Sequence, residues 1–239
     1  MFKRNKPKPL LSPGHSNAKT IKSDALGDYL THIMYLSSAS ISGKNVCPDS
    51  TPACRKFCIY FTGHGLSPVV QKARLRRTRF FFEDRKGFFN QLESEIEKAQ
   101  TRAEKQNKKL ALRLNGTSDL YFERIRPALF EQFPKAQWYE YSKSFDRMFD
   151  KNLPRNLDLT YSRSERTTDK QFFDVLEAGF NVAVVFRHSN FPKTYRGYPV
   201  VNGEEHDLRF LDQKGCVVAL TAKGPIAKAD KTGFVVDYN

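Results

Sequence analysis

The hydrophobic positions of the chain follow two periods, one typical of helices and one typical of strands. From residue 84 to 109, apolar side chains recur at intervals of three and four, which predicts a long helix with one buried face. The leucines at 110, 112 and 114 then alternate with polar neighbours, as in a half-buried strand. The same criteria predict further elements along the chain: strands at 137–144, 156–164 and 181–187, and helices at 121–133 and 170–180.

Strands and helices alternate with short connections, which is typical of strand–helix–strand units in a parallel sheet. We therefore predict an α/β fold whose parallel units form a TIM-barrel-like arrangement, complete or incomplete. After Pro199 the alternation of strands and helices ends. Strands near 206–212 and 216–222, followed by a last strand at 233–237, predict an antiparallel C-terminal hairpin at an edge or cap of the sheet.

The chain has 239 residues, enough for one large domain with a buried core. Residues 1–20 are rich in Lys, Pro, Ser and Gly and predict a basic N-terminal arm. Residues 21–239 then form a single domain that carries a cysteine-rich insert at 47–64. No apolar run approaches the ~20 residues of a membrane span, and no signal-peptide core is present. We expect a cytoplasmic protein without a membrane partner.

The charge balance favours a polyanionic partner. Lys and Arg number 40 against 26 Asp and Glu, a net charge of +14, so nucleic acid, DNA or RNA, is the first partner to consider. The alternative is a solvated basic surface. Basic residues cluster around three adjacent phenylalanines, at Lys72, Arg74, Arg76, Arg77, Arg79, Arg85 and Lys86. Arginines there can neutralise phosphates while the Phe rings stack on bases, or the rings can anchor the segment to the core.

Polar side chains end each predicted strand. They are Arg113, Asn115, Thr117, Ser118 and Asp119 after the first, Ser142, Lys143 and Ser144 after the second, Ser162, Arg163 and Ser164 after the third, and Arg187 and His188 after the fourth. Sites in α/β proteins form where the carboxyl ends of parallel strands meet, so we predict one shared pocket. Within it, cations would bind phosphate and amide or hydroxyl groups would contact a base, the candidates being Arg113, Asn115, Ser142, Lys143, Ser162, Arg163 and Arg209.

Two aspartates are candidates for catalysis. Cleavage of a glycosidic bond passes through a cationic sugar, which one carboxylate can stabilise while a second group handles the proton. Asp119 ends a strand in a glycine-containing turn, and Asp207 alternates with Arg209 on one face of a predicted strand. Structural alternatives exist for both: Asp119 can cap the following helix, and Asp207 can form an ion pair with Arg209.

The segment CPDSTPACRKFC holds three of the four cysteines, Cys47, Cys54 and Cys58. Three thiolates can bind zinc with a fourth ligand, for which His64 just downstream and the distant Cys216 are candidates, or three irons of a cubane iron–sulfur cluster with one iron left open. Buried thiols that behave as small apolar groups, or a redox pair, are the alternatives. Cys216 lies between apolar residues and is expected in the core.

Several motifs together resemble bacteriophage proteins related to the mycobacteriophage gene product 88 family. They span nearly the whole chain: LLSPGHSNAKT, CPDSTPACRKFC, RLNGTSD, YEYSKS, LTYSRSE, DLRFLD and ALTAKG with KTGFVV. The resemblance implies a phage protein acting in the host cytoplasm.

At the level of fold, the chain is also similar to tRNA-guanine transglycosylases and their phage DNA-modifying relatives. That resemblance implies exchange of a guanine for a 7-deazaguanine base, with one Asp as nucleophile, another as acid or base, and a structural zinc. Such an enzyme would flip the base out of a duplex. Two alternatives remain open: a nucleic-acid-binding module with a structural metal, and an iron–sulfur enzyme. The sequence lacks GxGxxG, GxxxxGK[ST] and GxSxG motifs.

Overall fold

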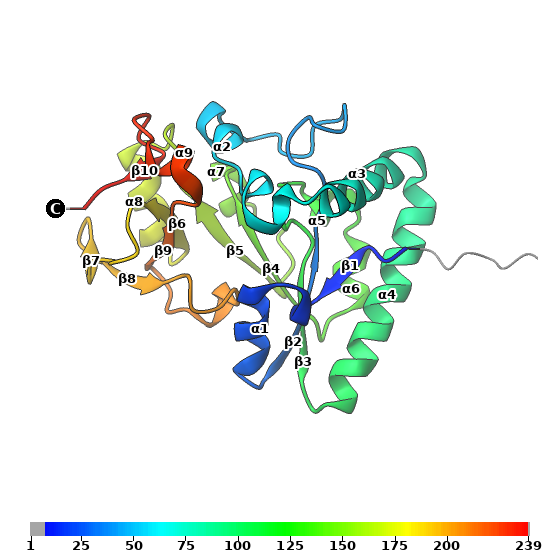
Figure 1. The fold of residues 1–239 in the computed structure, drawn as a ribbon. Helices are drawn as coiled ribbons and strands as arrows, with labels where there is room; N and C mark the ends of the chain where they lie inside the picture. Colours follow the sequence, from blue (N-terminus) through cyan, green and yellow to red (C-terminus); the bar gives the residue numbers. More distant parts are fainter. Residues whose placement is uncertain (1–7, 239) are drawn as a thin grey trace, which may run out of the picture.

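The computed structural model describes residues 8–238 and is organised around one ten-stranded sheet (Figure 1). Its strand order is β1-β2-β3-β4-β5-β6-β9-β8-β7, with β10 paired to β6. The strands are β1 (Leu11–Pro13), β2 (Tyr29–Met34), β3 (Lys109–Arg113), β4 (Gln137–Ser142), β5 (Leu157–Ser162), β6 (Asn181–Phe186), β7 (Thr194–Tyr195), β8 (Tyr198–Asn202), β9 (Val217–Thr221) and β10 (Val235–Val236).

The sheet is mainly parallel and does not close. Every neighbouring pair from β2 to β8 along the strand order is parallel, and β10 is parallel to β6. Antiparallel pairing occurs at the two edges, where β1 pairs with β2 and β7 pairs with β8. The predicted α/β class and the four predicted strands that became β3, β4, β5 and β6 are confirmed, and the barrel-like arrangement is the incomplete form.

The helices are α1 (Ala18–Ala25), α2 (Pro52–Lys56), α3 (Pro68–Glu83), α4 (Arg85–Lys105), α5 (Phe122–Ile125), α6 (Ala128–Gln132), α7 (Phe145–Met148), α8 (Asp169–Glu177) and α9 (Gly224–Lys228). Four short 3-10 helices accompany them, η1 (Gly14–Ser16), η2 (Ile59–Phe61), η3 (Gly63–Leu66) and η4 (Arg209–Leu211). The long predicted helix is α4. The predicted helix at 121–133 is divided into α5 and α6 at Pro127, because proline lacks the N–H that a continuous helix requires.

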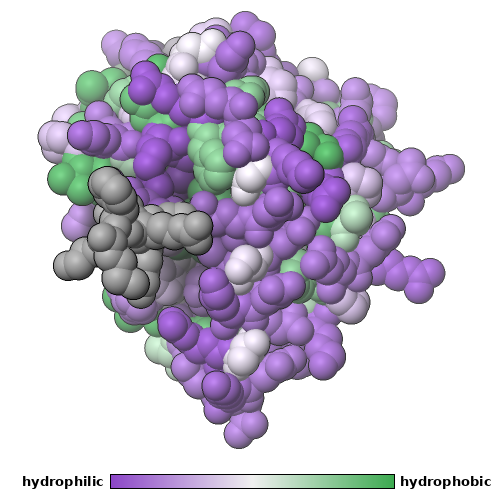
Figure 2. Space-filling model, turned by 90° about the vertical axis from the view of Figure 1, so that its right-hand side faces the viewer, coloured by the Kyte–Doolittle hydropathy of each residue, from purple (hydrophilic) through white to green (hydrophobic). Residues whose placement is uncertain are grey.

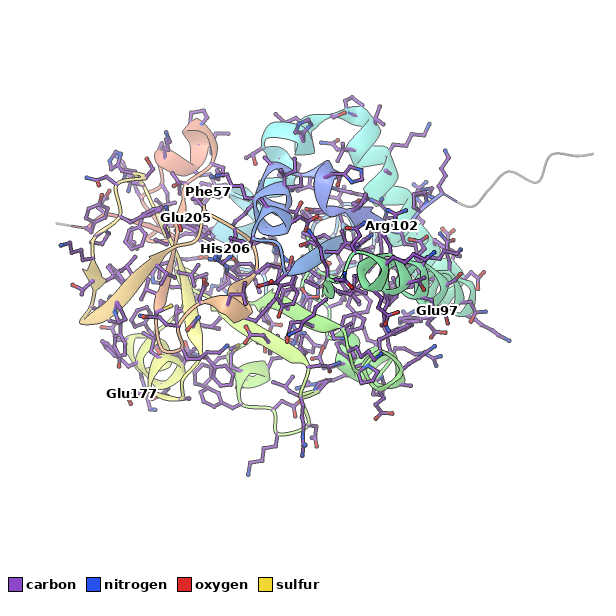
Figure 3. The ribbon with its side chains drawn as sticks, turned by 90° about the horizontal axis from the view of Figure 1, so that it is seen from below. Phe57, Glu97, Arg102, Glu177, Glu205 and His206 are labelled. Atoms are coloured by element: carbon purple, nitrogen blue, oxygen red, sulfur yellow. The ribbon has the colours of Figure 1, made fainter. Side chains whose placement is uncertain are left out.

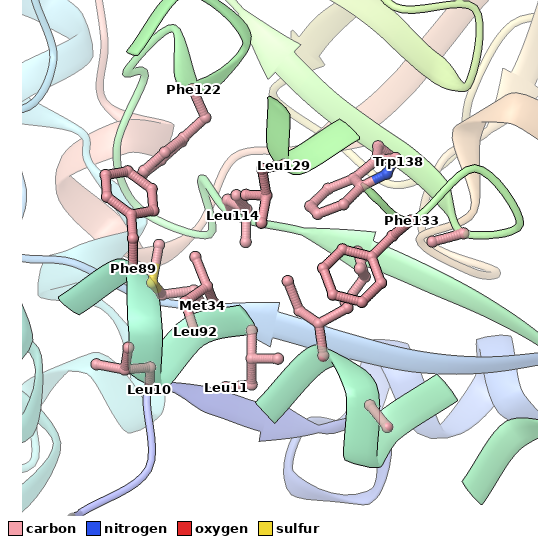
Figure 4. Close-up of a cluster of buried hydrophobic side chains, with 14 of the residues drawn as sticks. Leu10, Leu11, Met34, Phe89, Leu92, Leu114, Phe122, Leu129, Phe133 and Trp138 are labelled. Carbon is pink, nitrogen blue, oxygen red and sulfur yellow. The ribbon is translucent and has the colours of Figure 1, made fainter. Parts of the chain in front are cut away.

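One face of the sheet packs against the long helices. Leu110, Leu112 and Leu114 point to this face, as their alternation predicted, and join a buried cluster with residues of α3 to α6. Figure 4 shows this cluster, with Phe89 of α4 and Trp138 of β4 among its members. A second cluster covers β5, β6 and β9 with α7 and α8. Helices α3 to α8 therefore cover this face of the sheet.

The opposite face of the sheet is covered by the loop that precedes β9. Its residues Leu208 and Phe210 pack on Ala111 and Tyr139 of the central strands. The rings of Tyr139 and Phe210 meet edge to face at 5.7 Å. This loop therefore fills the part of the inner face that a closed barrel would enclose.

An antiparallel hairpin is present in the C-terminal part of the chain, as predicted, but it is not formed by residues 206–212 and 216–222. Residues 206–212 contain η4, whose Arg209 is almost completely buried, and β9 pairs in parallel with β6 and β8. The antiparallel pair is β7–β8, joined by Arg196 and Gly197, both with positive φ. An arginine gives no turn signal of the kind that Asn-Gly provides, so the pattern alone missed this hairpin.

The second half of the predicted N-terminal arm is part of the fold. β1 adds an edge strand, and the backbone N–H groups of Leu10 and Leu11 donate to the Glu95 carboxylate of α4. Residues 1–7 of the predicted arm lie outside the described part of the chain.

The surface around α4 is predominantly hydrophilic, as Figure 2 shows for the side of the molecule that carries this helix. Figure 3 shows Glu97 and Arg102 of α4 on the outer side of the molecule, with Glu177 of α8 at the opposite end. Within residues 8–238 no helix combines the length and apolar composition needed to cross a membrane.

Candidate functional site

A cavity of about 970 Å³ opens at the carboxyl ends of the parallel strands. Residues that follow β2, β3, β4, β5 and β9 line it together with the start of α1 and the cysteine-rich insert. Predicted site residues on its wall are Arg74, Arg113, Asn115, Asp119, Ser142, Lys143, Ser162, Asp207, Cys47, Cys54, Cys58 and His64. Three of the four predicted strand endings thus meet in one place.

The other predicted residues lie elsewhere. Arg187 borders a separate hollow near the C-terminus and pairs with Asp237. Arg163 is turned toward the backbone carbonyl of Gly233, to which its Nη1 donates at 2.7 Å. Arg209 is buried under the sheet. The remaining residues outside the cavity are Arg76, Arg77 and Arg79 of α3.

The basic, phenylalanine-rich segment is largely structural. Phe81 is fully buried, and its neighbours Phe80 and Phe82 pack against the same core. The guanidinium of Arg77 is turned inward and donates to the carbonyl of Pro9 at 3.1 Å. Arg76 donates to the same carbonyl, so part of the positive charge on α3 fastens the N-terminal segment to the helix. The Phe rings anchor the helix and do not form an exposed stacking surface.

The cysteine-rich insert brings three free thiols to the cavity. Cys54 lies on α2, and Cys58 follows the end of that helix. Ala39 N–H donates to the Cys47 sulfur at 3.4 Å, and the Cys58 sulfur lies 3.1 Å from the hydroxyl oxygen of Ser38. The first and the last of the three cysteines, Cys47 and Cys58, therefore contact the loop that follows β2.

The position of α2 is fixed by a carboxylate from another strand end. Thr51 caps the helix by accepting from Cys54 N–H, and its hydroxyl donates to Glu165 at 2.7 Å. Glu165 also accepts from Ala53 N–H at 3.2 Å. Glu165 follows β5 at the end of the LTYSRSE motif, and no local pattern indicates that it holds the insert in place.

Burial keeps the thiols of Cys47 and Cys54 protonated in the absence of a metal. It raises the pKa of Cys47 to about 12 and also raises the pKa of Cys54. Among residues 8–238, no group of three or more His, Cys, Asp or Glu side chains is arranged so that it could hold a metal ion. The predicted zinc site, with His64 as fourth ligand on the exposed η3, stays a prediction.

Asp119 belongs to a buried ionic network. Its carboxylate accepts from Lys143 N–H at 2.8 Å and from Arg147 at 3.3 Å, and Arg147 also forms two bonds with Glu123. Desolvation raises the pKa of Asp119, although Arg147 opposes the shift. Asp119 does not cap the following helix, because the N-cap position of α5 is Tyr121. The carboxylate instead joins the loops after β3 and β4.

Asp207 belongs to a second network. Its carboxylate lies 3.0 Å from Arg113 and 3.6 Å from Lys19, and Tyr139 donates to it at 3.2 Å. Burial acts to raise the pKa of Asp207, but the charges of Arg113, Lys19 and Arg209 together outweigh it, and the pKa is lowered. Asp207 therefore carries a charge that is compensated on two sides.

The predicted pair of Asp207 with Arg209 does not form. Arg209 lies 3.3 Å from Asp212 and donates to the backbone carbonyl of His206. The reason is that residues 209–211 form the 3-10 helix η4, which does not place 207 and 209 on a common face as a strand would.

The remaining polar residues of the cavity are occupied by local contacts. Lys143 donates to the Ser162 hydroxyl at 2.9 Å and lies 5.0 Å from the centre of the Phe234 ring. The side chain of Asn115 donates to Leu120 and accepts from Ser118, which organises the loop after β3. Contacts to a base edge by Asn115 and Ser142 stay predictions.

Several residues that line the cavity are not predicted by any local pattern of the sequence. Lys19 comes from the predicted arm, Glu204 and Lys223 from either side of β9, and Phe234 from the C-terminal segment. Glu204 binds the Thr221 N–H and the Lys223 ammonium. They are spread over more than 200 positions of the chain, and no local pattern connects them.

A mainly parallel, open sheet with a cavity at the carboxyl ends of its strands defines an α/β protein whose site is assembled from strand-end loops. The chain belongs to the Gene product 88 (GP88) family of bacteriophage proteins, whose family model matches residues 9–238. No curated protein and no solved structure matches the chain. The family resemblance is therefore confirmed, whereas the similarity to guanine transglycosylases finds no support.

Proposed function

We propose that the chain is an iron–sulfur enzyme that holds a cubane cluster on Cys47, Cys54 and Cys58. The observation that carries the proposal is that these three free thiols line one cavity at the carboxyl edge of the sheet. Three cysteines bind three irons of such a cluster and leave the fourth iron for another ligand. When bound, a cluster of this kind supplies single-electron chemistry or direct coordination of a substrate atom.

The number of the thiols favours a cluster over a single zinc ion. A structural zinc requires four protein ligands close around one atom, whereas a cubane cluster needs only three thiolates from the protein. In a cubane cluster each thiolate binds a different iron, so the sulfurs are further apart. Cys47 and Cys58 contact the adjacent residues Ala39 and Ser38 respectively, so both sulfurs lie against one loop of the cavity wall.

The chain's own residues would bind and orient a polar substrate beside the thiols. The ammonium of Lys143 faces the cavity from the loop after β4, between Ser162 and the ring of Phe234. Arg113 and Lys19 carry positive charge at another part of the wall, compensated by Asp207. Such alternating charges provide ion-pairing and hydrogen-bonding partners for a substrate that has both donors and acceptors.

A transglycosylase that exchanges guanine for a 7-deazaguanine base in DNA is less well supported. Its nucleophile would be Asp119 and its acid or base Asp207, and both carboxylates line the cavity. Each is already engaged by a cation, Asp119 by Arg147 and Asp207 by Arg113. A carboxylate held in this way must break an ion pair before it can attack a sugar carbon.

The test is the metal content of protein purified without oxygen. We expect about four iron and four sulfide per chain and a broad visible absorption that bleaches on reduction. Cys54→Ser should lose most of the iron, whereas the control Cys216→Ser should keep it, because Cys216 lies outside the cavity. Zinc at about one per chain would overturn the proposal in favour of a module with a structural metal. Protein that contains neither metal would also overturn the proposal, and would indicate that the thiols pack in the core or form a redox pair.

A further inference from the structure

Arg74 of α3 is a buried cation whose guanidinium has no carboxylate partner among residues 8–238. The residue is 8% exposed and lines the cavity. Its Nε and Nη1 atoms are buried and form no hydrogen bond within residues 8–238, and no carboxylate there lies within ion-pair distance. A buried charged donor without an acceptor is costly, so such a group is normally paired or serves a ligand.

The surroundings hold the guanidinium in place but do not satisfy it. The rings of Tyr35 and Tyr60 have their centres 5.1 and 5.2 Å from its central carbon. Tyr35 in turn packs so closely on Gly116 that a Cβ atom there would lie 2.4 Å from the ring. Aromatic faces attract a cation but accept no N–H hydrogen bond in its plane, so the edge of the guanidinium remains available.

Comparison with other buried arginines of this chain shows that Arg74 is different. Arg147 binds Glu123 and Asp119, and Arg113 binds Asp207. Arg77, one helical turn further along α3, is satisfied by the carbonyl of Pro9. Arg74 alone among these four has an unengaged side chain facing a large cavity.

We propose that Arg74 binds the phosphate group of a nucleotide substrate inside the cavity. A guanidinium with unpartnered N–H groups on Nε and Nη1 can donate to the oxygens of a phosphate, and the net charge of +14 attracts phosphate-bearing molecules. Ile59 and the aromatic Phe61 are half exposed on η2, at the wall of the same cavity, where they offer an apolar surface to a base. The inference rests on the proposed function for the use of this cavity and names its substrate class.

The experiment measures binding of adenosine 5′-monophosphate, adenosine, inorganic phosphate and acetate by calorimetry. We expect the monophosphate to bind at least about tenfold more tightly than adenosine, because a charged hydrogen bond contributes ~1.5–3 kcal/mol. Arg74→Met should weaken binding of the monophosphate about 10- to 100-fold and leave the affinity for adenosine unchanged. The matched control is Arg79→Met, an exposed arginine on the same helix that lies outside the cavity.

Two further variants keep the test decisive. Arg74→Lys retains the charge but loses the planar edge, and should bind the monophosphate with intermediate affinity. Gly116→Ala should displace Tyr35, which holds the Arg74 guanidinium, and so weaken binding of the monophosphate although Arg74 itself is retained. If Arg74→Met does not fold, these two variants carry the test.

Three results would overturn the inference: equal binding of adenosine and its monophosphate, competition by acetate as strong as that by phosphate, or unchanged affinity in Arg74→Met. A single-stranded oligonucleotide that binds more tightly than the monophosphate would assign the phosphate to a strand, and equal affinity would assign it to a free nucleotide. Iron measured in the same samples separates the two proposals. If the wild-type protein holds iron but does not bind the monophosphate, only the role of Arg74 is refuted. If it binds the monophosphate but holds no iron, only the cluster is refuted.

Discussion

Removal of the Arg147 side chain tests the buried network that joins the loops around the cavity. Arg147 is 1% exposed and forms a bidentate pair with Glu123 at 2.8 and 2.9 Å. Its remaining nitrogen reaches Asp119 at 3.3 Å. Arg147→Met would fill a similar volume but leave two carboxylates buried without their cation.

The expected cost is large because the partners cannot regain water. Breaking a buried pair by removing one partner typically costs ~3–5 kcal/mol, and a domain of this kind is stable by only ~5–15 kcal/mol. The matched control is Arg124→Met, which breaks the Arg124–Asp150 pair at a half-exposed position. Solvent screens that pair, so its loss should cost at most ~1 kcal/mol.

Urea unfolding at neutral pH, followed by circular dichroism, measures both differences as changes in the free energy of unfolding. The double variant Arg147→Met with Glu123→Gln should recover part of the loss, because one of the stranded carboxylates is then neutral. A loss below ~1 kcal/mol in Arg147→Met, similar to that of the exposed control, would refute the claim that this network holds the loops together.

Two further predictions concern stability. Burial raises the pKa of Glu140 to about 7, so the folded chain keeps a proton that the unfolded chain has released above about pH 4.5. Stability from this group therefore falls as pH rises from about 4.5 to about 7, and Glu140→Gln should gain up to ~3 kcal/mol relative to wild type between pH 5 and 8 in urea unfolding. A difference independent of pH would contradict this sign. Phe81→Ala should cost ~3–5 kcal/mol by leaving a cavity among aromatic rings, whereas Val69→Ala, 78% exposed on the same helix, should change stability by less than ~0.5 kcal/mol. Equal melting temperatures of the two variants would show that the Phe81 ring is not part of the core.

Local periodicity predicted the elements whose pattern depends on a single buried face. The leucines of β3 and the apolar face of α4 repeat at the periods of a strand and a helix, because each element packs one side against the same core. Alternation of strands with helices also predicted the parallel sheet and the meeting of strand ends. These are properties of neighbouring residues, and a linear sequence records them directly.

Where local pattern and tertiary packing disagreed, the packing determined the structure. Residues 207–211 alternate like a strand, yet Leu208 and Phe210 pack on the inner face of the sheet as part of a loop and a 3-10 helix. The β7–β8 hairpin turns at Arg196 without the residues that usually indicate a tight turn. Alternation shows which side chains share a face in an extended segment, but it does not show whether the segment has a strand beside it to pair with.

The sequence by itself determined the fold class, the family and the clustering of three cysteines in one short segment. Only the tertiary structure decided that these thiols line the same cavity as Asp119 and Asp207 and that both aspartates are paired with cations. It also decided that the Arg74 guanidinium has no carboxylate partner among residues 8–238. The physical reason is that pairing and burial depend on which loops meet in space. Asp207 and Arg113 are 94 residues apart, and only the folded sheet brings them within 3.0 Å.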